Sequence, residues 1–109
     1  MTQVVNFKSI PEYYQKEERG IKNNTVRVWE RFDKRFKLLD DFIYGAIDDL
    51  EIKITNTETG ESFTRRIRDV TEFEVAGKPL YIITWYNSLN HEKEDLKILL
   101  SILEVEDER

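Results

Sequence analysis

The chain has 109 residues, enough for one domain with a hydrophobic core, and its 17 Lys and Arg against 22 Asp and Glu give a net charge of −5. It contains no Cys and a single His, which excludes disulfides, cysteine nucleophiles and metal sites built from Cys or paired His, so we expect no metal and no cofactor. No apolar run approaches the ~20 residues of a membrane span, and the N-terminus lacks a basic-then-apolar signal, so we expect a cytoplasmic protein without membrane contact.

The first half of the chain alternates between strand and helix periods. Residues 3–8 predict a short strand, and Pro11 and Gly20 suit the first turn and the end of the helix that follows. Residues 25–29 alternate as a strand does, and residues 30–44 return to a helical period. The apolar stripe predicted for this second helix consists of Phe32, Phe36, Leu39 and Ile43.

The second half is mostly strand. Residues 50–55 and 62–68 alternate apolar and polar side chains, with turn residues between the two segments. The alternation breaks between Ile67 and Val70, which predicts a bulge or the end of the strand there. Residues 80–86 are apolar on both faces, which is typical of a central strand.

A last amphipathic helix, at about 91–103, completes the order of elements: strand, helix, strand, helix, three strands, helix. This order predicts one α+β domain over residues 1–109, a small, partly closed β-barrel of about five strands with three helices across its openings. A ferredoxin-like sheet is the main alternative. That sheet requires a pair of strands between the first two helices, where the sequence predicts only one.

One motif is specific enough to suggest a family. The segment Gly20-Ile21-Lys22-Asn23-Asn24-Thr25-Val26-Arg27 has the pattern G-x-K-x-x-T-x-R. It resembles the signature of ASCH domains in the PUA-like superfamily, which includes small phage and bacterial proteins. The resemblance covers roughly residues 3–86. It implies a PUA-like barrel with a cleft in which Lys22 and Arg27 face a nucleotide, an RNA or another polar ligand.

The residue types in this motif suit such a ligand. Thr25, Arg27 and Trp29 fall on one face of the predicted strand, which would align a hydroxyl, a guanidinium and an indole. Arg offers a planar fork to phosphates and base edges, and Trp offers a stacking surface. Arg66 and Arg68 would extend the basic surface. The alternative is that Trp29 only packs under the next helix while Arg27 pairs with a carboxylate.

These observations leave three functions open. The first is a nucleotide- or RNA-binding module whose ligand-contacting residues are Lys22, Thr25, Arg27, Trp29, Arg66 and Arg68. The second is implied by the resemblance, because small amidohydrolases of the same superfamily remove the acetyl group of N4-acetylcytidine. In that case Lys22 would be the base, Thr25 the nucleophile and Glu74 the later carboxylate. The third is a phage or bacterial protein–protein interaction module that uses the acidic surface and the last helix. We expect binding rather than catalysis.

Overall fold

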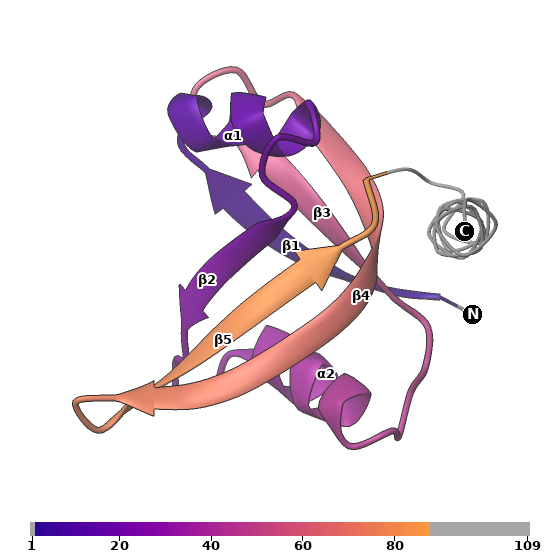
Figure 1. Cartoon of the computed structure of the whole chain (residues 1–109), viewed down its shortest axis with the longest axis vertical. Coiled ribbons are helices and arrows are strands. Elements are labelled where there is room, and N and C mark those ends of the chain that lie inside the picture. The colour runs from indigo at the N-terminus through magenta and orange to yellow at the C-terminus, as the bar shows by residue number, and fades with distance from the viewer. Residues whose placement is uncertain (1, 88–109) are drawn as a thin grey trace, which may run out of the picture.

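The computed structural model describes residues 2–87, and the helix expected at about 91–103 lies outside them. These residues form an α+β fold of five strands and two helices (Figure 1). In chain order the elements are β1 (Gln3–Ser9), α1 (Pro11–Glu18), β2 (Asn24–Val28), α2 (Lys34–Ile43), β3 (Leu50–Asn56), β4 (Ser62–Val75) and β5 (Lys78–Trp85). Neither helix in this part of the chain is long and apolar enough to cross a membrane.

All five strands belong to one sheet in the order β1-β3-β4-β5-β2, which leaves β1 and β2 at its two edges. β1 and β3 run parallel, and the other three pairs are antiparallel. The sheet curls into a half-barrel (Figure 1), in agreement with the partly closed barrel that the order of elements predicts. Within residues 2–87 only β2 separates the two helices, so the strand pair of a ferredoxin-like sheet is missing.

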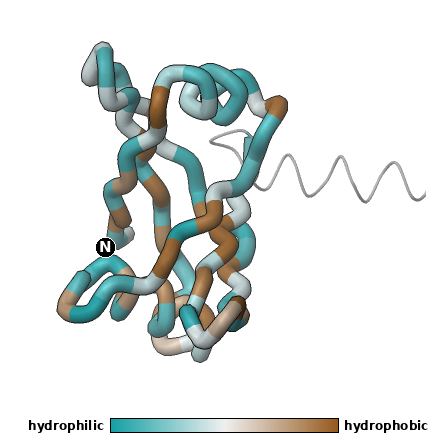
Figure 2. The backbone as a smooth tube through the Cα atoms, turned by 90° about the vertical axis from the view of Figure 1, so that its left-hand side faces the viewer, coloured by the Kyte–Doolittle hydropathy of each residue, from teal (hydrophilic) through white to brown (hydrophobic). Residues whose placement is uncertain are grey.

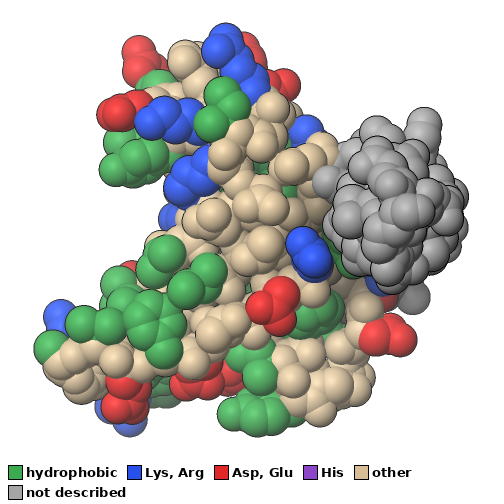
Figure 3. Space-filling model, in the orientation of Figure 1, with side chains coloured by type: hydrophobic (Ala, Val, Ile, Leu, Met, Phe, Trp, Pro, Cys, Tyr) green, Lys and Arg blue, Asp and Glu red, His purple; other side chains and the backbone are tan. Residues whose placement is uncertain are grey.

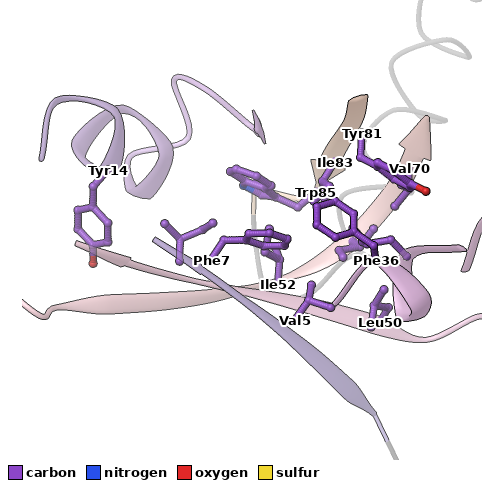
Figure 4. Packing of buried hydrophobic residues seen from close by; sticks show 13 residues of the cluster. Val5, Phe7, Tyr14, Phe36, Leu50, Ile52, Val70, Tyr81, Ile83 and Trp85 are labelled. Carbon is purple, nitrogen blue, oxygen red and sulfur yellow. The ribbon is translucent and has the colours of Figure 1, made fainter. Parts of the chain in front are cut away.

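The hydrophobic core fills the inside of the half-barrel, and the two helices cover its opposite ends (Figures 1 and 4). At one end Tyr14 of α1 packs against Phe63, with ring centroids 5.4 Å apart. At the other end Phe36 of α2 packs against Tyr81, with centroids 5.0 Å apart. The buried apolar side chains are Val5, Phe7, Tyr14, Phe36, Leu39, Leu50, Ile52, Ile54, Ile67, Val70, Tyr81, Ile83 and Trp85.

The strands follow the two-residue period expected of a sheet with one buried face. Figure 2 views the chain from the left-hand side of Figure 1, and hydrophobic and hydrophilic residues alternate along its strands. In β3, Leu50, Ile52 and Ile54 are fully buried, whereas the residues between them are more exposed. The alternation predicted for residues 50–55 is therefore confirmed.

The strand predicted at 62–68 is longer than expected. β4 continues to Val75, with a shift in its pairing to β5 between Ile67 and Asp69. The bulge that the broken alternation predicts is therefore confirmed, and the chain resumes strand pairing beyond it instead of ending there.

The second helix begins at Lys34 and not at residue 30, which corrects one predicted core residue. Phe32 precedes the helix with a φ of 68° and is 89% exposed. The physical reason is the N-cap: the Asp33 carboxylate accepts the backbone N–H of Arg35 at 3.0 Å, which starts the helix after Phe32. The other members of the predicted stripe pack on or against the core.

Candidate functional site

The order of the strands leaves an opening between the edge strands β1 and β2, which we call the seam. A pocket of about 390 Å³, the seam pocket, lies there between the C-terminal end of β1, helix α1 and β2. In Figure 3 the surface is hollowed on the left below α1, and basic side chains lie along the hollow. The polar and aromatic residues that line the seam pocket are Lys8, Ser9, Tyr13, Glu17, Lys22, Thr25 and Arg27.

Arg27 connects the two edge strands across the seam. Its Nε donates to Thr25 Oγ1 on β2 at 3.0 Å, and its Nη2 donates to Ser9 Oγ on β1 at 3.3 Å. The guanidinium carbon lies 4.8 Å from the centroid of the Phe7 ring. A guanidinium has five N–H groups, so most of its donors are not used by these two bonds. Arg27 is thus fixed in position and still able to bind an acceptor.

The charge of Arg27 has no carboxylate partner among residues 2–87 within ion-pair distance. Burial lowers the pKa of its guanidinium from the ordinary value; the Glu17 carboxylate opposes this effect and the charge of Arg35 adds to it. An arginine nevertheless stays protonated at neutral pH. A partly buried cation without an ion-pair partner is costly, and a bound anion would lower that cost.

Lys22 is held against α1 at the other side of the seam pocket. Its Nζ donates to Glu17 Oε2 at 3.0 Å and to the carbonyl oxygen of Asn24. It also lies 5.8 Å from the centroid of the Tyr13 ring. Within residues 2–87 none of the hydrogen bonds of Lys22 reaches Thr25, whose hydroxyl accepts from Arg27 instead.

Lys8, Ser9, Tyr13 and Glu17 line the seam pocket although the sequence prediction did not include them as site residues, and Glu17 is the buried carboxylate among them. Its side chain is 1% exposed, and its Oε1 has no hydrogen-bond partner among the described residues. In the sequence it stands in a run of charged residues, which favours a solvated helix face. The available signal is its spacing: Glu17 follows Tyr14 by three residues, so both lie on the buried face of α1.

Trp29 and Glu74, two predicted site residues, lie away from the seam pocket. Trp29 follows the last residue of β2, is 40% exposed, and donates its backbone N–H to the carbonyl oxygen of Pro79. Glu74 pairs with Pro79 near the turn between β4 and β5 and is exposed. Neither residue lines the seam pocket with Lys22 and Thr25.

Arg66 and Arg68 also lie outside the seam pocket. Arg66 forms an ion pair with Asp49, beside the start of β3. Because β3 runs parallel to β1 and its first residue pairs with Gln3, this ion pair lies roughly 20 Å along β1 from Ser9 at a rise of about 3.3 Å per residue. Arg68 is exposed, with its guanidinium 6.0 Å from the Tyr86 ring.

The structure therefore brings Lys22, Thr25 and Arg27 to one concave site and adds a buried carboxylate to them. No protein-family profile, curated protein or solved structure matches this chain. The ASCH or PUA-like relationship therefore stays a prediction from the motif.

Proposed function

We propose that this protein is a nucleotide-binding domain of PUA-like type, which holds a nucleotide, free or as a unit of RNA, in the seam pocket. The observation that carries the proposal is Arg27, a partly buried guanidinium with uncommitted donors and no carboxylate partner among residues 2–87. A phosphate accepts planar N–H pairs from arginine with strong, charge-assisted hydrogen bonds.

The rest of the seam pocket suits the other parts of a nucleotide. Lys8 and Lys22 join Arg27 against the single acid Glu17, so the pocket has an excess of positive charge on a chain of net charge −5. The Tyr13 ring is half exposed at the pocket wall and offers a face on which a base can stack. The volume of about 390 Å³ is within the range of small-molecule sites, about 300–1,000 Å³.

Substitution of two arginines tests the proposal. Arg27→Gln removes the charge in the seam pocket, and Arg68→Gln removes the same charge from an exposed position outside it. Hydrogen bonds to charged groups contribute about 1.5–3 kcal/mol, so Arg27→Gln should weaken binding of nucleoside monophosphates by about tenfold or more. Isothermal titration calorimetry at 50 mM and 200 mM salt provides the measurement.

The control variant Arg68→Gln shows whether a loss of binding in Arg27→Gln is specific to the seam pocket. Arg68→Gln should leave the dissociation constants close to those of the wild type. If both variants weaken binding equally, the effect is one of net charge and the seam pocket is not the site. If the wild type binds no mononucleotide and no RNA at low salt, the proposed function is wrong.

A second candidate is the amidohydrolase, and the contact between Lys22 and Glu17 is the observation that favours it. Glu17 would replace Glu74 as the carboxylate that orients Lys22, and Thr25 would be the nucleophile. This reading requires Lys22 to leave its present acceptors, because a base must lie within about 3.2 Å of the hydroxyl that it deprotonates. Release of acetate from N4-acetylcytidine, abolished by Thr25→Ala, would establish catalysis, and no release by the wild type would exclude it for this substrate.

A further inference from the structure

A second hollow of about 270 Å³ lies in the seam on the other side of Arg27. It shares Val26 and Arg27 with the seam pocket as a common wall and extends toward α2 instead of α1. We call it the adjacent hollow. Its further lining residues include Phe7, Val28, Glu30 and Arg35.

The charges around the adjacent hollow differ from those of the seam pocket. The Asp33 carboxylate balances the positive charge of Arg35, because the Arg35 Nε donates to Asp33 Oδ1 at 2.9 Å. This hydrogen bond raises the pKa of the guanidinium. Glu30 adds a negative charge to the lining. The adjacent hollow therefore has no excess of positive charge that would attract a phosphate. An uncharged group such as a nucleobase fits this environment better.

Arg35 also provides a flat surface held in place. Its Nη1 donates to the carbonyl oxygen of Asn6 at 2.8 Å, and its guanidinium carbon lies 4.3 Å from the centroid of the Phe7 ring. The bonds to Asp33 and Asn6 fix the plane of the guanidinium. Bases stack on such planes as they do on aromatic rings.

We propose that the seam binds two consecutive nucleosides of a single strand, with their linking phosphodiester on Arg27, one nucleoside in the seam pocket and the next in the adjacent hollow. The inference rests on the proposed function and deepens it, because it makes the ligand a single-stranded oligonucleotide instead of a mononucleotide. Three observations carry this assignment: the central cation, the two hollows that share it, and the excess of positive charge in the seam pocket that the adjacent hollow lacks.

Dinucleoside monophosphates test whether the adjacent hollow binds a second base, because they add a base to a mononucleotide without adding negative charge. ApA, CpC, GpG and UpU each carry one phosphodiester charge, fewer than the 3′- and 5′-mononucleotides of the same bases. Stacking of one further base should nevertheless make at least one dinucleoside monophosphate bind about fivefold or more tightly than both of its mononucleotides. If every mononucleotide binds as tightly as its dinucleoside monophosphate, the adjacent hollow holds no base and this inference is wrong while the proposed function stands. If none of these ligands binds, both are wrong.

Two matched variants locate the second base. Val28→Asp adds a negative charge at the adjacent hollow, and Val75→Asp adds the same charge at an equally exposed strand position, 51% against 52%, outside both hollows. The ratio of dinucleoside to mononucleotide affinity should fall toward one in Val28→Asp and keep its wild-type value in Val75→Asp. An equal change of this ratio in the two variants would contradict a base in the adjacent hollow.

Discussion

The inward-facing strand positions have different roles on two sides of the half-barrel, the side where each strand is paired and the seam between the two edge strands. On β3, which pairs with a strand on each side, Ile52 and Ile54 point inward and are fully buried. On the edge strand β2 the inward positions hold Thr25 and Arg27. Arg27 donates across the seam to Ser9 Oγ on β1 and, within β2, to Thr25 Oγ1. Because the paired side of the sheet supplies the apolar burial, the seam can carry polar groups that a closed barrel would have no room to satisfy.

The largest effect should come from the paired side. Ile52→Ala removes a fully buried side chain from β3 and should lower the free energy of unfolding by about 2–5 kcal/mol, the usual range for core truncations. The matched control is Ile21→Ala, which removes the same atoms from a side chain that is 73% exposed and should change stability by less than about 0.5 kcal/mol. Urea unfolding measures both changes in stability. Equal losses for Ile52→Ala and Ile21→Ala would mean that the inward position on β3 contributes no more to stability than an exposed side chain.

At the seam, the pair Lys22–Glu17 should behave asymmetrically. Lys22→Met leaves the Glu17 carboxylate buried without its cation and should cost about 1–3 kcal/mol, whereas Glu17→Met leaves a lysine that can still reach water and should cost less. The double variant should recover most of the loss, since two apolar side chains can replace a buried pair. Additive losses in the urea unfolding of all three variants would mean that the two charges are not coupled.

Much of the fold follows from local sequence patterns. The alternation in residues 50–55 and the broken period near Ile67 each have one simple structural solution, because a strand with one buried face needs apolar residues at every second position. Phe32 is the instructive failure. Its apolar spacing fits the helix, but with Asp33 as the N-cap the helix begins at Lys34, and capping outweighs the burial of a single aromatic ring.

The candidate site could be predicted only where its residues are close in sequence. Thr25 and Arg27 share one face of β2, so their proximity follows from strand geometry alone. Glu17 is also close in sequence to Lys22, but its burial depends on the packing of α1 against the sheet, which the charged run around it does not indicate. The position of Arg66 likewise depends on its pairing partner in β3, which places it beside Asp49 and far from the seam.

The cap of α2 offers a smaller effect with a definite pH dependence. Hydrogen bonding by Arg35 holds the pKa of Asp33 below its ordinary value, so the ionised carboxylate stabilises the folded state. Asp33→Asn keeps a side chain that can cap the helix but loses the charge in the hydrogen bonds with Arg35, and should cost about 1 kcal/mol at pH 7. This contribution is fully present above the unfolded pKa of about 3.9 and is lost as the pH falls through the lower folded value, so the difference between wild type and variant should shrink below about pH 4. A difference that stays constant from pH 7 to pH 3 would show that Asp33 does not act through its charge.

The smallest effect should come from Arg66, and it decides whether the seam alone binds the ligand. Arg66 is held by Asp49 and by the carbonyl oxygen of Asp48, near the start of β1, whereas the seam pocket lies at the other end of that strand. Exposed charges farther apart than about 8 Å are largely screened at physiological salt, so Arg66→Gln should weaken nucleotide binding by less than roughly twofold. Calorimetry beside Arg27→Gln measures the difference between the two arginines. A loss for Arg66→Gln as large as that for Arg27→Gln would place the ligand across both ends of β1, and the contrast between a structural paired side and a binding seam would be wrong.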